Sequence, residues 1–262
     1  MKFLFPVGHT VLRCAILLVA LMSVNAWAAL TAEQAGRLFA KACGSDQEAL
    51  HALIVEGDKG NPYAQYRLGL LYRVGIGAVS RDDAQAAQWW RKAAQQGNAE
   101  AQNQLGFLYV NGEGVSRDYA QAAQWWNKAA QQGNAEAQQH LGALYANGQG
   151  VPQDLAQAVQ WWRKAAQQGD SDAQINLGQL YVNGQGVPRS KVVAYALWSL
   201  SDATVASSPL STGSSEYHSR LANVMTKQEI EAGQVLSREM SRAGNLLNAL
   251  DKYLAETKPQ SP

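Results

Sequence analysis

The sequence is low in charge, in cysteine and in long apolar segments. Only 16% of its 262 residues are charged, below the roughly one quarter that is usual. Its 22 Lys and Arg nearly balance its 21 Asp and Glu, which argues against the clustered positive charge that sequence-independent nucleic-acid binding needs. The hydrophobic fraction of 47% excludes a chain that is disordered throughout, and the 8 tryptophans are a surplus that needs a cause.

The first residues have the features of a secretory signal peptide. Lys2 and Arg13 provide positive charge, an uncharged run covers Cys14–Val24, and Ala26 and Ala28 fit the small residues at a cleavage site. The run is shorter than the roughly 20 residues that a membrane-spanning helix needs, so an uncleaved anchor is the less favoured alternative. We expect residues 1–28 to be removed and the protein to be exported to the periplasm, the exterior or the cell envelope.

Removal of this segment leaves Cys43 as the single cysteine and brings the net charge to about −1. An exported protein with one cysteine has no internal disulfide, so packing must stabilise it. We interpret Cys43 as a small buried apolar residue rather than a reactive thiol.

A repeat of about 36 residues dominates the rest of the chain. The block Ala64–Tyr72 recurs at Ala101–Tyr109, Ala137–Tyr145 and Ala173–Tyr181, and the block Ala86–Ala94 recurs at Ala122–Ala130 and Ala158–Ala166. Three Trp-Trp pairs in the second block account for six of the tryptophans. Apolar residues within both blocks follow helical spacing, so each unit is predicted to be a pair of antiparallel helices.

Polar residues mark the predicted helix ends. Asp82, Asp118 and Asp154 each stand three residues before a glutamine (Gln85, Gln121 and Gln157), which is a capping-box pattern. Asn98, Asn134 and Asp170 are expected N-caps of the next helix, and Gly97, Gly133 and Gly169 are expected stop residues.

Glycine recurs inside the first helix, at Gly69, Gly106, Gly142 and Gly178. Because glycine costs about 1 kcal/mol in a helix interior, its recurrence predicts a close approach of two helices, with alanines on the partner helix. We expect Trp90, Trp126 and Trp162 between the two helices of a unit, and Trp89, Trp125 and Trp161 toward the stacking interface or the solvent edge.

The repeat closely resembles the Sel1-like repeat, a relative of the tetratricopeptide repeat. The residues that carry the resemblance in one unit are Ala101, Leu105, Gly106, Tyr109, Gly112, Gly114, Val115, Asp118, Ala122, Trp125, Lys128, Ala129, Ala130 and Gly133. The resemblance covers residues 63–202 as four units, of which the last departs from the pattern after Pro188. It implies an all-α fold, an α/α solenoid in which antiparallel helix pairs form a right-handed superhelix, and a scaffold that offers a concave surface to other proteins.

The flanks are predicted to cap the array. Residues 29–62 show two helical patterns, residues 203–216 form a Ser-rich linker, and residues 217–262 hold C-terminal helices and a tail. Thr226 and Glu229 form a further capping box, and apolar spacing then continues from Leu236 to Leu254 with a possible bend at Gly244. We interpret this helix as a lid on the last repeat.

Catalytic and metal chemistry have little support. The Gly-x-Gly pairs recur in every unit and follow helices, which is typical of turns and not of a nucleotide site. His51, His140 and His218 lack the spacing of metal ligands, and no nucleophile motif is present. Some cysteine-rich exported relatives are described as β-lactam-binding or hydrolysing, but the paired cysteines of that subgroup are missing. We therefore expect no enzyme, no catalytic residue, no metal and no cofactor.

Recognition is expected where the units differ, because positions fixed between units are explained by packing. The resemblance places the first helix of each unit on the concave surface. The predicted partner-binding residues are Tyr66, Arg67, Leu70 and Arg73, then Asn103, Gln104, Phe107 and Asn111, then Gln139, His140, Ala143 and Asn147, and finally Ile175, Asn176, Gln179 and Asn183.

This lining is rich in amides and has a cationic end, which suits a protein or an extended peptide with an acidic group near Arg67 and Arg73. We expect a monomer that binds no nucleic acid and does not insert stably in a membrane after cleavage. Two alternatives stay open: these positions are merely solvated, or the protein organises the cell envelope by docking through residues 203–262.

Overall fold

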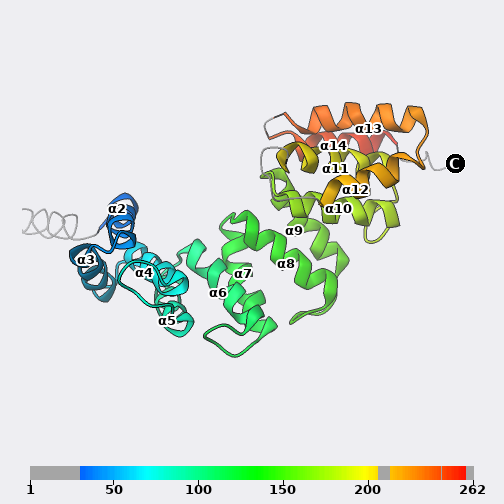
Figure 1. Ribbon diagram of the computed structural model, residues 1–262. Coiled ribbons are helices and arrows are strands. Elements are labelled where there is room, and N and C mark those ends of the chain that lie inside the picture. Colours follow the sequence, from blue (N-terminus) through cyan, green and yellow to red (C-terminus); the bar gives the residue numbers. More distant parts are fainter. Residues whose placement is uncertain (1–29, 206–212, 243, 258–262) are drawn as a thin grey trace, which may run out of the picture. The chain divides into compact units, whose positions relative to one another are not determined.

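The computed structural model describes residues 30–205, 213–242 and 244–257, and all the regular secondary structure in these ranges is helical (Figure 1). The predicted signal peptide lies outside the described residues. The chain divides into two compact units between Gln96 and Gly97. The prediction of an all-α chain built from helix pairs is confirmed.

The first unit contains α2 (Ala32–Cys43), α3 (Gln47–Asp58), α4 (Pro62–Val74) and α5 (Asp83–Gln95). The second contains α6 (Ala99–Asn111), α7 (Tyr119–Gln131), α8 (Ala135–Asn147), α9 (Leu155–Gln167), α10 (Ser171–Asn183), α11 (Lys191–Val205), α12 (Gly213–Ala222), α13 (Lys227–Met240) and α14 (Leu246–Glu256). In each repeat we name the first helix helix A (α4, α6, α8, α10) and the second helix B (α5, α7, α9, α11). Helices A and B of one repeat pack against each other.

A tryptophan of helix B explains the glycine inside helix A. The indole N–H of Trp162 donates to the backbone carbonyl of Gln139 at 2.9 Å, and a Cβ added to Gly142 would lie 2.6 Å from the same indole. Trp90, Trp126 and Trp198 stand in the same way over Gly69, Gly106 and Gly178. The predicted close approach is confirmed, but the contacting group is an indole and not the expected alanine, because a flat ring fits only where the Cβ is missing.

The other tryptophan of each pair lies under a lysine. Trp89, Trp125 and Trp161 have the ammonium groups of Lys92, Lys128 and Lys164 at 4.0, 4.3 and 4.3 Å from their ring centroids. Trp89 packs in the core of the first unit with Leu53 and Leu68, and Trp161 packs against the core formed by α7 and α8. The packing of Trp89 and Trp161 agrees with the expected stacking interface.

The helix caps follow the sequence with one correction. The carboxylates of Asp82, Asp118 and Asp154 accept from the backbone N–H of Gln85, Gln121 and Gln157 at 2.9–3.0 Å, as predicted. The backbone N–H of each aspartate donates to the carbonyl of Tyr72, Tyr109 or Tyr145 at the end of helix A. The capping-box prediction is therefore wrong in its second half, because this N–H is already satisfied without the glutamine side chain. True capping boxes form at Thr31 and Thr226.

A pair of glutamines links helix A to the end of helix B within each of the first three repeats. The amide nitrogens of Gln96, Gln132 and Gln168, at the end of helix B, donate to the side-chain oxygens of Gln65, Gln102 and Gln138 at 2.8–2.9 Å. Gln65 and Gln138 in turn donate to the carbonyls of Gly57 and Ala130, at the end of the preceding helix. Some of the glutamines that take the place of surface charge therefore form a structural hydrogen bond that recurs in three repeats.

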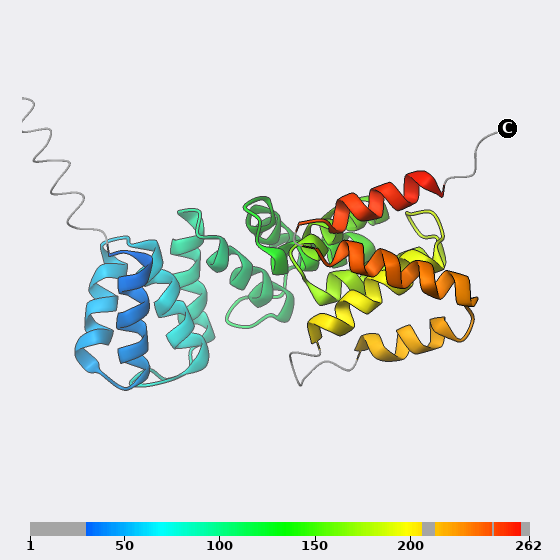
Figure 2. The same cartoon turned by 90° about the horizontal axis from the view of Figure 1, so that it is seen from above.

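The C-terminal helices cover the last repeat (Figures 1 and 2). Helix α13 packs on α11 and α14 packs on α13 and α9, and Leu236, Met240, Leu246 and Leu250 are buried in the shared core. The single helix expected from Leu236 to Leu254 is two helices, because α13 ends at Met240 and Gly244 adopts a left-handed φ of 71°. Helix α12 begins at Gly213, inside the expected linker; residues 206–212 lie outside the described part.

Candidate functional site

The outward residues of helix A form the candidate site, and we name them the helix-A face. In the second unit Gln104, Phe107, His140, Ala143, Ile175, Asn176 and Gln179 are half-buried, and Asn111, Asn147 and Asn183 are exposed. Asn103 and Gln139 are only 2% and 9% exposed. These two residues, expected in the lining, belong to the packed layer because their carbonyls receive the indoles of Trp126 and Trp162.

An aromatic cluster joins two of the predicted residues. The ring of Phe107 on α6 meets the ring of His140 on α8 edge to face, with centroids 4.6 Å apart. His140 also stacks on Trp126 at 4.8 Å. Burial lowers the pKa of His140 from its usual value, and the charges of Glu136 and Asp172 act in the opposite direction. This is a half-buried neutral aromatic surface that a partner side chain can pack on.

Acidic residues border the helix-A face of the second unit. Glu100, Glu136 and Asp172 occupy the same position in α6, α8 and α10, and these three helices contain no Lys or Arg. Glu136 accepts a hydrogen bond from the side-chain amide of Asn103 at 2.6 Å. Variation between the repeats does not reveal this border, because the position is acidic in all three of them.

The first unit has the opposite charge on its helix A. The guanidinium of Arg67 lies 5.2 Å from the ring centroid of Phe39 and 5.6 Å from that of Tyr66. Tyr66 and Leu70 are half-buried beside it. Arg67 therefore has a stacked, partly covered setting that keeps a cation on this helix.

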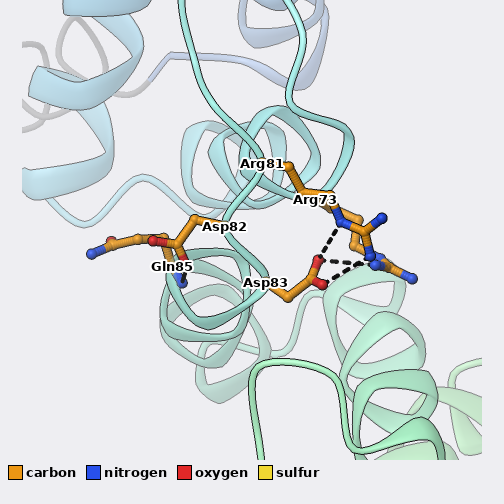
Figure 3. A network of polar contacts seen from close by, with 5 residues as sticks. All are labelled: Arg73, Arg81, Asp82, Asp83 and Gln85. Carbon is orange, nitrogen blue, oxygen red and sulfur yellow. Dashed lines mark hydrogen bonds and ion pairs between the residues drawn. The ribbon is translucent and has the colours of Figure 1, made fainter.

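Arg73 pairs with an acidic residue of the protein itself and not, as expected, with an acidic group of a partner (Figure 3). Its guanidinium bonds the carboxylate of Asp83 at 2.9 Å, and Arg81 bonds the second oxygen at 2.9 Å. Hydrogen bonds from Arg81 and then from Arg73 hold the pKa of Asp83 below its usual range. Arg73 also stands at the position of Val110 in the repeat, one residue before the equivalent of Asn111. Its first role is thus to hold the start of α5 against the end of α4.

A serine, a histidine and an aspartate come together where no motif indicated it. The His218 ring lies with Nε2 3.2 Å from Ser199 Oγ and Nδ1 2.8 Å from Asp202 Oδ2. The Ser199 hydroxyl donates to the carbonyl of Tyr195, one turn back in α11, at 2.8 Å. Its proton is thus engaged in the helix, and the cluster serves to attach α12 to α11 rather than to activate a nucleophile.

The described residues offer no group of three or more potential metal ligands. None of the helices in the described ranges is both long and apolar enough to cross a bilayer. Cys43 is half-buried and free.

Two solved structures have a fold similar to that of this chain. A protective antigen of uropathogenic Escherichia coli, c5321, which displays an SLR fold, has a TM-score of 0.72 and 30% identity over 89% of this chain and 50% of its own. A Sel1 repeat protein from Oxalobacter formigenes has a TM-score of 0.62 and 30% identity over 80% of this chain and 88% of its own. Both support the α/α solenoid arrangement.

Relatives among characterised proteins are much longer. The Arabidopsis thaliana proteins HRD3A and HRD3B, ERAD-associated E3 ubiquitin-protein ligase components, are 36% and 37% identical over 84 and 75 residues. The matched part is only 12% and 11% of those proteins. The family model of the Sel1 repeat matches residues 62–98, 99–134, 135–170 and 171–201. These four repeats span more than half of the residues, and the chain belongs to the Sel1 repeat family.

Proposed function

We propose that this protein is an exported, non-enzymatic scaffold that binds a protein or an extended peptide through its helix-A faces. The observation that carries the proposal is the combination on α6, α8 and α10 of a half-buried Phe107–His140 pair, half-buried or exposed amide side chains, and an acidic border. Aromatic rings supply contact area, amides can pair with a peptide backbone, and charge sets orientation. The relatives named as ligase components support a role in protein assembly.

The charges of the two units refine the chemistry of the partner. Glu100, Glu136 and Asp172 favour Lys or Arg in the segment that contacts the second unit. Arg67 favours an acidic group in the segment that contacts the first unit.

The test is a pull-down from periplasmic and cell-surface extracts. The variant Arg67→Ala/Phe107→Ala/Asn111→Ala alters the helix-A faces, and the control Gln124→Ala/Gln160→Ala alters exposed positions of helix B. We expect the first to lose the partner and the control to keep it. Equal recovery by all three proteins would place recognition elsewhere.

Export rests on the charged start, the short apolar run and the Ala-x-Ala site of residues 1–28. Intact-mass measurement on the exported protein should show a chain that begins after Ala28. A protein that retains Met1 would contradict cleavage. We further propose a monomer, which light scattering on the purified protein checks.

A second candidate is an envelope organiser that docks through its C-terminal helices. A groove of about 260 Å³ between α13 and α14 is lined by Val235, Leu236, Ala249 and Tyr253, and Val235 is 48% exposed. Cell fractionation separates the two candidates, because an organiser stays with washed envelopes and a soluble binder does not. A Val235→Glu variant that leaves the envelope fraction would support this second candidate.

A further inference from the structure

Helix α12 is held on the last repeat by little apolar contact. It packs on α11, and Leu221 is the one buried residue among those of α12 whose side chains the structure describes. Tyr217 is 42% exposed, although its ring lies 5.7 Å from that of Trp198. Because so little apolar surface holds this helix, its polar contacts with α11 decide how firmly it is attached.

His218 supplies a polar contact between the two helices at each of its ring nitrogens. Nδ1 lies 2.8 Å from Oδ2 of Asp202, and Nε2 lies 3.2 Å from Oγ of Ser199. The Ser199 hydroxyl donates its single proton to the carbonyl of Tyr195, so its oxygen can only accept from the ring, and an ionised carboxylate also only accepts. Both nitrogens of His218 must therefore carry a proton for all three hydrogen bonds to form together, and a ring in that state is positively charged.

The neutral form of this ring makes one hydrogen bond fewer. With its proton on Nδ1, the ring keeps the bond to Asp202, but Nε2 then competes with the carbonyl of Tyr195 for the proton of Ser199. With its proton on Nε2, the ring keeps the bond to Ser199, but the lone pair on Nδ1 then faces a carboxylate oxygen. Protonation of the ring thus adds a hydrogen bond and turns the contact with Asp202 into a charge-assisted pair, which is the stronger kind.

The charged groups around the ring also favour its protonated form. Asp202 is the charged group of α11 that faces His218, and the two side chains are only 25% and 23% exposed, so solvent screens this pair less than a surface pair. Tyr195, also on α11, contacts the ring edge to face, with centroids 4.2 Å apart. On α12 itself, Glu216 and Arg220 are exposed and pair with each other, so their charges largely cancel.

We propose that protonation of His218 controls the attachment of α12 to α11. With both ring nitrogens protonated, His218 holds α12 in place, and loss of one proton to solvent loosens α12 while α13 stays packed on α11. A loosened α12 exposes the sides of Tyr195 and Trp198 that contact His218 and Tyr217. The end of the repeat array is therefore covered under acidic conditions and more accessible as the pH rises. This control does not involve the helix-A faces, so it stands or fails independently of the partner proposed there.

Hydrogen exchange followed by mass spectrometry on the full chain tests the proposal. Amide exchange in α12 is measured at pH 5 and at pH 8, at the two ends of the range in which imidazole titrates, and is divided by the chemical exchange rate at each pH. We expect α12 to be about tenfold less protected at pH 8, because it loses a charge-assisted hydrogen bond. Helix α5, in the first unit, is the internal reference and should be equally protected at both. Equal protection of α12 at both pH values, or greater protection at pH 8, would overturn the proposal.

Variants separate control by a proton from an ordinary structural contact. His218→Gln keeps a polar side chain that does not titrate and should abolish the difference between the two pH values, whatever it does to protection itself; Asp202→Asn should reduce the difference. Tyr195→Phe changes the other titratable group beside the ring and should keep it. The matched controls His51→Gln and His140→Asn replace the other two histidines in the described part of the chain and should also keep it. A difference that persists in His218→Gln, or that disappears in Tyr195→Phe or in either control, would contradict the proposal.

Discussion

The fourth repeat resembles the three before it in helix A and differs from them in helix B. Gly178 and Trp198 keep the indole-on-glycine contact of the earlier repeats. Around that contact the outer positions change: the exposed Gln160 and Lys164 correspond to Ala196 and Leu200, and the half-buried Trp161 corresponds to Leu197. All three replacements are buried, at 0–8% exposure.

This difference shows how the array ends. In the third repeat, the outer side of helix B carries Gln160 and a lysine that lies over Trp161. In the last repeat, α12 and α13 pack on helix B (α11). The contact inside the pair is therefore a requirement of every repeat, and the outer side is adapted to what comes next. Four pairs of substitutions test the comparison between the repeats.

The shared contact should be the most costly to remove in either kind of repeat. Trp198→Ala and Trp162→Ala each delete a buried indole and its hydrogen bond to a helix-A carbonyl, with an expected loss of about 3–5 kcal/mol. Urea unfolding followed by circular dichroism measures both. A cost below about 1 kcal/mol for Trp198→Ala would show that the last repeat no longer depends on the contact.

Substitutions on the outer side of helix B should have different effects on stability in the two kinds of repeat. Ala196→Gln restores the residue of the earlier repeats but places it under the C-terminal helices, at an expected cost of about 2–3 kcal/mol from overpacking and an unpaired amide. The reverse change, Gln160→Ala, affects an exposed residue and should be nearly neutral. Thermal melts of both variants check this pair, and similar costs would contradict the assigned difference.

Removal of the N-cap of helix B should cost less stability in the fourth repeat than in the third, and this difference should be smaller than the one above. Asp154 accepts from the N–H of Gln157 at 3.0 Å, and Ser190 accepts from that of Val193 at 3.3 Å. Asp154→Ala should cost about 1 kcal/mol, and Ser190→Ala less because its bond is longer and its oxygen is uncharged. A larger loss for Ser190→Ala than for Asp154→Ala, measured by urea unfolding, would reverse this ranking.

The sequence was sufficient for the helix pairs, their stop glycines and the family, because these depend on periodic local signals that recur in each repeat. It was not sufficient for contacts that join distant residues. The Arg73–Asp83 pair and the His218 cluster depend on which helix covers which. Asn103 illustrates the limit: it varies between repeats as a surface residue would, yet its side chain is buried.

The smallest expected effect is a pH dependence that arises from His140 in the third repeat. His140 stands at the position of Asn176 in the fourth repeat. Since burial lowers the pKa of His140 in the folded chain, the unfolded chain binds this proton more readily, and stability should fall as the pH drops below about 6.5. His140→Asn should reduce the difference in urea midpoint between pH 7.5 and pH 5, whereas Asn176→Gln should leave it unchanged. An unaltered difference in His140→Asn would mean that the imidazole is protonated equally well in both states, and that Glu136 and Asp172 offset its burial.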